Sequence, residues 1–273
     1  MIDRVSKQRL EELWLLLDDR DKNILTSIQE YRYLTTDQVR RLHFTESVND
    51  TAALRATSRN LKKLKEMNLI NSLDRRIGGI GSGSGSLIWK LEAAGEHLLR
   101  LLSNHAHPRR KHFEPSAYFL SHTLAVSECF VRITEISRGR SVKLTKIQNE
   151  PDNWRPYNSG GKIVLLKPDL FAVTVCGGYE DRWMFELDLS TESPVRIIEK
   201  CRRYHQYYQS GLEQKQFGVF PLVVWIVPDA TRKLNLARHI QTEFAKLPNI
   251  FTVITPNELE ALVKQGAGEG ETS

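Results

Sequence analysis

Carboxylates set into apolar, strand-like runs constrain the fold of this chain more than any other feature. Asp169 follows Pro168 inside the run 163–173, and Glu186 and Asp188 close a second apolar run. Burying an unpaired carboxylate is costly, so acids in strands need a compensating partner. Residues two apart on a strand point to the same side, which places Glu186 and Asp188 together. We therefore expect two neighbouring strands whose three acids converge on one point.

Three converging carboxylates suit a hard divalent cation. Mg²⁺ or Mn²⁺ selects carboxylate oxygens, and the backbone carbonyl of Leu187 is a further oxygen ligand. Such an ion polarises a phosphodiester and activates a water molecule. The sequence therefore predicts Asp169, Glu186 and Asp188 as the metal ligands and catalytic residues of a phosphodiester-cleaving site. The alternative is a set of surface acids at strand ends.

Composition and length narrow the class of protein. The 273 residues are enough for one large domain or two ordinary ones, and 40% hydrophobic with 26% charged residues is typical of a soluble globular protein. The longest apolar stretches are too short to span a bilayer, and no secretory leader pattern is present. Three cysteines without CxxC spacing fit a reducing compartment. We expect a cytoplasmic protein with no membrane partner.

Positive charge is concentrated in the N-terminal part. The net charge is +6, and residues 1–115 contribute +5 of it, from 20 Lys/Arg against 15 Asp/Glu. Within residues 51–76, seven basic residues stand against two acids. Such an excess gives salt-sensitive affinity for nucleic acid. The alternative is a solvated helix face, and the candidate contacts on the expected helix 52–67 are Arg55, Arg59, Lys62 and Lys63.

The N-terminal pattern predicts a winged helix-turn-helix. Apolar spacing and capping residues indicate helices over 7–17, 21–31, 38–43, 52–67 and 93–102, with short strands at 69–73 and 87–91 around a glycine-serine run. In such a domain the basic helix enters the major groove and the wing lies along the backbone, where Arg75 and Arg76 would meet a phosphate. The glycine-serine run also fits an interdomain linker, and small helical domains also bind proteins without touching DNA.

The C-terminal pattern predicts a mixed α/β domain. We expect a linker at 105–115, separating domain 1–104 from domain 116–265, and a disordered tail at 266–273. Residues 222–227 are apolar on both faces, as in a sheet covered by helices on both sides. The expected elements are a helix at 116–136, strands at 143–149, 163–175 and 182–189, a helix at 195–208, a strand at 222–227, a helix at 232–244 and a strand at 251–254.

The acidic motifs resemble those of the PD-(D/E)XK, restriction-endonuclease-like superfamily. Pro168-Asp169 matches the first motif and Glu186-Leu187-Asp188 the second, with Asp188 where the family carries lysine. Members of the superfamily move that lysine to the following helix, where Lys200 lies with Tyr204 one turn on. The resemblance implies that Lys200 neutralises the phosphate or steers the water, with Tyr204 as an accessory residue. Otherwise Lys200 is an ordinary exposed lysine. Glu128 is a candidate outer-shell acid or a solvated glutamate.

Taken whole, residues 20–260 resemble the replication-relaxation family of plasmids and integrative elements. The stretches that carry this resemblance are 21–99, Lys167-Pro168-Asp169, Phe185-Glu186-Leu187-Asp188 with Ser190-Thr191-Glu192, and Lys200-Cys201-Arg202-Arg203-Tyr204. The resemblance implies a plasmid-borne DNA-processing protein related to conjugative relaxases, which nick DNA at a transfer or replication origin.

The predicted partner is therefore double-stranded DNA, with a homodimer, an ATPase or a second nuclease subunit left open. A rival interpretation is a non-catalytic DNA-binding regulator of replication or transfer on a degenerate nuclease fold. Asp188 in the lysine position keeps this alternative open.

Overall fold

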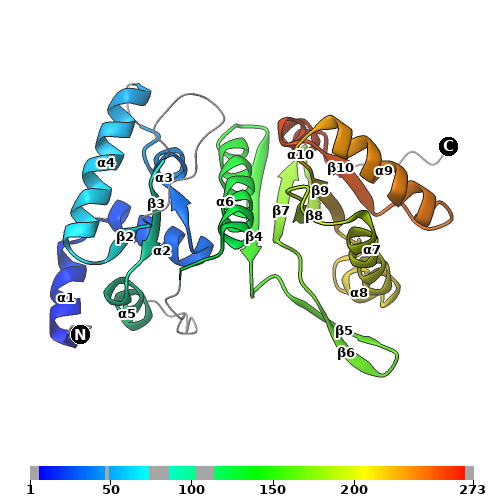
Figure 1. Cartoon of the computed structure of the whole chain (residues 1–273), viewed down its shortest axis with the longest axis horizontal. Helices are drawn as coiled ribbons and strands as arrows, with labels where there is room; N and C mark the ends of the chain where they lie inside the picture. The colour runs from blue at the N-terminus through cyan, green and yellow to red at the C-terminus, as the bar shows by residue number, and fades with distance from the viewer. Residues whose placement is uncertain (1–5, 47–48, 74–85, 103–113, 268–273) are drawn as a thin grey trace. The chain divides into compact units, whose positions relative to one another are not determined.

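The chain forms two compact units, residues 1–131 and 132–273 (Figure 1). The computed structural model describes residues 6–46, 49–73, 86–102 and 114–267. The division falls inside helix α6 (Ala117–Ser137) and not at the predicted linker 105–115, most of which lies outside the described residues. Packing explains the shift, because the rings of Tyr31 and Phe130 stack with centroids 4.0 Å apart and join the first part of α6 to the N-terminal unit.

The N-terminal unit is a winged helix, as predicted. Strand β3 pairs antiparallel with both β1 and β2, which confirms the hairpin that follows the basic helix. Arg75, Arg76 and nearly all of the glycine-serine run lie outside the described residues. The elements are α1 (Lys7–Leu16), α2 (Asp19–Tyr31), β1 (Leu34–Thr35), α3 (Thr36–His43), α4 (Asp50–Glu66), β2 (Ile70–Ser72), β3 (Ile88–Leu91) and α5 (Ala93–Leu102).

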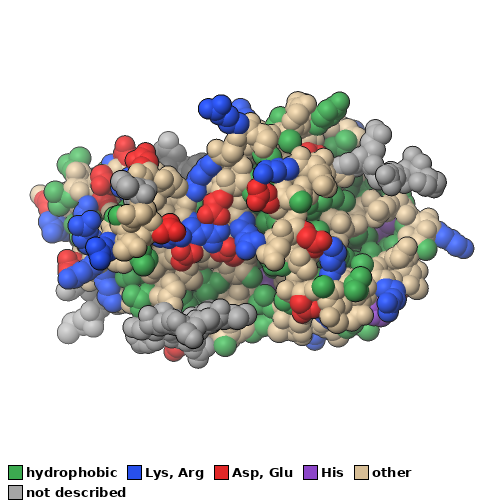
Figure 2. All heavy atoms as spheres, turned by 90° about the horizontal axis from the view of Figure 1, so that it is seen from above, with side chains coloured by type: hydrophobic (Ala, Val, Ile, Leu, Met, Phe, Trp, Pro, Cys, Tyr) green, Lys and Arg blue, Asp and Glu red, His purple; other side chains and the backbone are tan. Residues whose placement is uncertain are grey.

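Helix α4 buries one stripe and exposes a basic one. Its buried residues are Ala53, Thr57, Leu61 and Leu64, at the three- and four-residue spacing of one helix face. Leu54 lies outside this stripe and is 46% exposed, whereas Ala53 occupies the inward position. In Figure 2, Lys and Arg side chains gather at the left end of the face drawn, over the part of the molecule that α4 occupies in Figure 1.

A buried carboxylate joins α4 to α2. Asp21 is fully buried and closes the capping box of α2 with Asp18. It accepts hydrogen bonds from Asn60 Nδ2 at 2.7 Å and from Lys63 Nζ at 2.5 Å. Lys63 was predicted to contact DNA, but its ammonium lies against Asp21, so it has a structural contact inside this unit.

The C-terminal unit is built on a five-stranded mixed sheet of order β10-β9-β8-β7-β4. Strands β8, β9 and β10 run parallel, while β7 and β4 pair antiparallel, which confirms the predicted mixed sheet flanked by helices. The strands are β4 (Val142–Asn149), β7 (Leu170–Cys176), β8 (Tyr179–Leu187), β9 (Leu222–Ile226) and β10 (Phe251–Ile254). The helices are α7 (Pro194–Gln209), α8 (Leu212–Phe217), α9 (Ala230–Phe244), the 3-10 helix η1 (Pro256–Glu258) and α10 (Leu259–Gln265).

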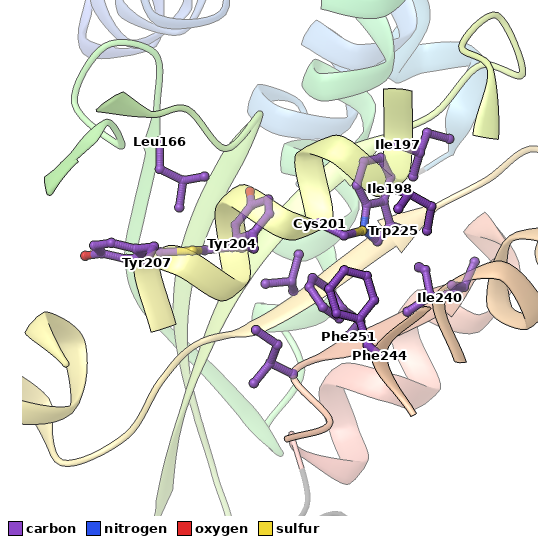
Figure 3. Packing of buried hydrophobic residues seen from close by; sticks show 14 of the residues in the cluster. Leu166, Ile197, Ile198, Cys201, Tyr204, Tyr207, Trp225, Ile240, Phe244 and Phe251 are labelled. Atoms are coloured by element: carbon purple, nitrogen blue, oxygen red, sulfur yellow. The ribbon is translucent and has the colours of Figure 1, made fainter. Parts of the chain in front are cut away.

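One face of this sheet packs against α7 and α9. Alternate residues of each strand point to this side, so Met184, Val223 and Trp225 share a core with both helices. Figure 3 shows Cys201 and Tyr204 of α7 turned toward the same core. The apolar stripe of α7 thereby fixes which of its polar residues face the sheet.

The single strand predicted at 163–175 is wrong. The chain forms β6 (Lys162–Leu166) and β7, which belong to different sheets, and β6 pairs with the unpredicted β5 (Arg155–Ser159). The break falls at Pro168, which has no N–H to donate to a sheet. Asn153, fully buried, donates from Nδ2 to the Pro168 carbonyl at 2.6 Å and holds the break. Asp169 therefore lies just before β7 and not within a strand.

Removing the buried carboxylate of the N-terminal unit tests its structural role. We expect Asp21→Ala to lower the free energy of unfolding by about 2–3 kcal/mol, because Asn60 and Lys63 lose their acceptor and the capping box opens. Chemical denaturation followed by circular dichroism measures the loss. Asp19→Ala is the matched control, since this acid lies in the same helical turn with a fully exposed side chain and should leave stability almost unchanged. Equal stability of the two variants would contradict the assignment.

Candidate active site in the C-terminal unit

Glu186 is the most deeply buried acid of the predicted site. It lies near the end of β8 and is 0% exposed. Its side chain points to the α7 side of the sheet, as does Met184 two residues earlier, and Trp225 lies opposite it on β9. A carboxyl group in such apolar surroundings needs partners, because neither water nor the strand supplies them.

Two residues of α7 supply those partners. Lys200 Nζ donates to Glu186 Oε2, and the Tyr204 hydroxyl donates to Glu186 Oε1. The two donors are four residues apart, so they lie on the same side of the helix. Ser193 caps α7 and Pro194 occupies its first turn, which fixes where the helix begins and hence where both donors point.

Asp169 reaches the same ammonium from the start of β7. Its carboxylate lies 3.8 Å from Lys200 Nζ, and its Oδ2 accepts a hydrogen bond from the Leu187 N–H at 2.8 Å. Its own N–H donates to the Phe185 carbonyl at 3.1 Å. Asp169 is thus fixed across the β7–β8 pair by backbone bonds on both sides. The structure brings Asp169, Glu186, Lys200 and Tyr204 together as the sequence predicted.

Burial and charge shift the protonation of these groups. Burial raises the pKa of Glu186 to about 8, against the opposing influence of the Lys200 ammonium. Burial lowers the pKa of Lys200, but the charges of Glu186 and Asp169 outweigh it and hold that pKa above its ordinary value. Burial also raises the pKa of the Tyr204 hydroxyl, which therefore stays a hydrogen-bond donor. Among these groups, Glu186 is the one that titrates near neutral pH.

Asp188 was predicted to join this cluster, but it lies in a different set of contacts. Its Oδ2 accepts from Arg232 Nε at 2.6 Å and its Oδ1 accepts from the Ser190 N–H at 2.9 Å. Arg232 also donates to the Glu192 carbonyl at 2.7 Å. Asp188 lies one residue beyond the end of β8, where the backbone turns into the loop before α7, so the strand alternation no longer sets its direction. Asp188 thereby ties the start of α9 to this loop.

The predicted cage of three carboxylates is therefore not assembled. Among the described residues, no group of three His, Cys, Asp or Glu side chains is arranged to hold a metal ion. Two carboxylates remain together, those of Asp169 and Glu186. Their chemistry fits Mg²⁺ or Mn²⁺, because Mg²⁺ commonly keeps several waters and uses one or two carboxylates together with substrate phosphates. Lys200 would have to leave its place between them.

Glu128 has a different environment from the one we expected. It lies in the part of α6 that belongs to the N-terminal unit, where its carboxylate pairs with Arg41 at 2.7 Å and accepts a hydrogen bond from Gln38 at 3.2 Å. These contacts join α6 to α3. They give Glu128 a structural role in the winged helix in place of the outer-shell role.

The basic residues predicted on α4 divide into two kinds. Arg55, Arg59 and Lys62 are exposed, and Lys62 pairs loosely with Glu66 at 3.7 Å on the same surface. Lys63 is held by Asp21, as described above. The structure thus leaves Arg55, Arg59 and Lys62 at the surface of the helix that a winged helix presents to DNA.

Sequence reasoning missed two residues that position this site. Arg232, the partner of Asp188, lies in the first turn of the helix after β9. Because β8 and β9 are parallel, the ends of both strands lie at one edge of the sheet, and that rule would have pointed to the pair. Asn153 holds the carbonyl next to Asp169. It comes from a turn with no regular pattern, so no signal in the sequence singled it out.

The raised pKa of Glu186 predicts how stability depends on pH. The folded chain holds the Glu186 proton up to about pH 8, whereas an ordinary glutamate releases it near 4.5. The folded state therefore carries more protons between these values, so this group's stabilising contribution falls as pH rises from 5 to 8. We expect Glu186→Gln to remove at least about 1 kcal/mol of that pH dependence, the order of one pKa unit. Urea denaturation at pH 5 and pH 8 measures it.

Glu258→Gln is the control for this measurement. The hydrogen bond from Lys233 lowers the pKa of Glu258 to about 2, so this acid does not titrate between pH 5 and pH 8. The control should keep the pH dependence of the wild type. A Glu186→Gln variant with that same dependence would contradict a raised pKa at Glu186.

The chain was compared with curated proteins, solved structures and protein families. No curated protein gives a significant match. Among solved structures, that of the restriction endonuclease FokI bound to DNA is matched with 12% identity and a TM-score of 0.26, over 90% of this chain and 44% of the FokI chain. A score this low carries no argument about fold or function. No described helix has the length and apolar character needed to cross a bilayer. The replication-relaxation family matches residues 25–223, from α2 through the sheet to β9, and the chain therefore belongs to the replication-relaxation family.

Proposed function

We propose that the chain binds duplex DNA through its winged helix and cleaves it as a metal-dependent endonuclease or nickase. The observation that carries this proposal is the meeting of Asp169, Glu186 and Lys200 from two strands and a helix. Two carboxylates can hold a metal ion that polarises a phosphodiester, and an ammonium beside them can neutralise charge on the phosphate. Family membership supports a role in replication, and we extend it to relaxase-like nicking in plasmid or mobile-element replication or transfer.

Each residue of the site has a distinct role in this proposal. Asp169 and Glu186 would hold Mg²⁺ or Mn²⁺, which supplies polarisation of the scissile phosphate and an activated water. Tyr204 holds one oxygen of Glu186, which leaves the oxygen now bound to Lys200 for exchange. Lys200, 29% exposed, is the cation of the cluster that reaches toward solvent, where it neutralises the negative charge of a bound phosphate.

A second candidate function follows from the same contacts. In this structure Glu186 and Asp169 share the ammonium of Lys200, and Asp188 pairs with Arg232. Acids that each have a cationic partner within the fold can serve stability alone, without catalysis. This observation favours the rival function, a non-catalytic DNA-binding regulator of replication or transfer on a nuclease-like fold.

Cleavage of supercoiled plasmid carrying the element's own origin region separates the two functions. In Mg²⁺ we expect the wild type to convert it to the nicked or linear form, and Asp169→Asn or Glu186→Gln to abolish the conversion. Tyr204→Phe should slow it about 10- to 100-fold, as loss of a group that orients a ligand does. Glu199→Gln, an exposed acid next to Lys200, is the control for the change of charge and should cleave like the wild type.

Duplex binding is measured on the same proteins. The cleavage variants should bind as the wild type does, whereas an Arg55→Ala/Arg59→Ala variant should bind more weakly at every salt concentration. DNA binding without cleavage by the wild type would favour the regulator. Cleavage that persists in both Asp169→Asn and Glu186→Gln would refute the proposed site.

A further inference from the structure

The β5–β6 hairpin presents an unusual outer face. Along its register, Pro156 pairs with Leu165 and Asn158 with Ile163, and all four side chains are exposed. Ile163 is 84% exposed, among the most exposed large hydrophobic residues described. Of the alternate residues, Tyr157 is buried and Val164 packs against the core of the unit. We call the set Pro156, Asn158, Ile163 and Leu165 the outer face of the hairpin.

The inner face anchors the hairpin to the rest of its unit. Tyr157 is buried, and its hydroxyl donates to Gln206 Oε1 at 3.3 Å on α7. Arg155 pairs at 3.1 Å with Glu213, which is itself buried and also accepts a hydrogen bond from Tyr207 at 2.8 Å. The hairpin is therefore held against α7 and α8 by one side only. Figure 1 shows it extending beyond the end of the five-stranded sheet.

The tip of the hairpin is preorganised. Gly160 and Gly161 have φ values of 59° and 79°, the left-handed conformation that two-residue hairpin turns need at both central positions. Asn158 Oδ1 accepts a hydrogen bond from the Gly161 N–H at 3.0 Å. Ile163 is thus displayed two residues from a tight turn, on a ribbon whose shape is already set.

The charge of the hairpin favours one kind of partner. Residues 154–167 contain Arg155, Lys162 and Lys167 and no acid. Lys162 and Lys167 are exposed at the two ends of β6, with Lys167 Nζ 3.9 Å from the centre of the Trp154 ring. Exposed apolar side chains between two lysines match a polymer that offers phosphates on its outside and apolar stacked bases within. Duplex DNA has this chemistry.

We propose that the outer face, together with the lysines at the two ends of β6, is a second DNA-contacting element. Lys162 and Lys167 bind phosphates, and Ile163 enters the duplex between bases. Apolar wedges on β-ribbons act in this way in proteins that kink DNA. The position along the chain fits this role, because β6 ends at Leu166, three residues before Asp169, and Asn153 joins the base of the hairpin to Pro168. The inference rests on the proposed DNA-binding function and extends it to how the duplex is held near the acids.

The experiment uses the full chain and a fluorescein-labelled duplex that carries 2-aminopurine, whose fluorescence rises when it is unstacked. We expect Ile163→Ala to lose the rise in fluorescence and to bind the duplex about 5- to 10-fold more weakly, as loss of a stacking contact does. Lys162→Ala/Lys167→Ala should reduce the slope of log affinity against log salt by about 1.8, the value for two phosphates. Leu234→Ala and Lys246→Ala, exposed residues outside the hairpin, are controls and should match the wild type.

Each other result overturns a stated part of the account. If the wild type does not bind duplex DNA, the proposed DNA-binding function fails and this inference fails with it. If Arg55→Ala/Arg59→Ala weakens binding but all hairpin variants behave as the wild type, the inference alone fails. If Ile163→Ala changes the mass in light scattering and not the DNA response, the outer face is a contact between copies of the chain.

Discussion

The hydrogen bonds from Lys200 and Tyr204 to the buried Glu186 carboxyl are the interaction on which the rest of the C-terminal unit depends. A fully buried carboxyl on the central strand β8 is tolerable only because α7 brings an ammonium and a hydroxyl to its two oxygens. That requirement fixes the rotation of α7 on the sheet. The same ammonium lies near Asp169. The residues that stabilise the buried carboxyl are therefore also the residues suited to phosphate chemistry.

The features that the sequence predicted best are those set by a local pattern of apolar residues or by helical spacing. The apolar run that ends at Glu186 and the apolar run of β9 predicted both strands, and the spacing of Lys200 and Tyr204 predicted that they share one side of α7. Prediction failed where backbone chemistry overrides pattern. The apolar residues on both sides of Pro168 look like one strand, yet the missing N–H ends β6 before β7 begins.

Ion pairs between residues far apart in the sequence were the other feature that could not be predicted. Asp188 was placed in a metal site because it follows Glu186 by two residues, but the strand ends at Leu187 and Arg232 binds Asp188 from α9. Lys63 carries the charge expected of a DNA contact, and only the fold shows that its ammonium pairs with Asp21. A charged residue on one element has several possible partners, and sequence spacing cannot rank partners that come from distant segments.

The proposed function assigns DNA binding to one unit and chemistry to the other. The winged helix displays Arg55 and Arg59 while Lys63 and Glu128 join its own helices, and in the C-terminal unit Asp169 and Glu186 meet at one lysine. Mn²⁺ titration by calorimetry tests the claim that these acids form a metal-dependent site. The account predicts one ion bound per chain, lost in the Asp169→Asn/Glu186→Gln double variant. No binding to the wild type, or equal binding to both proteins, would contradict it.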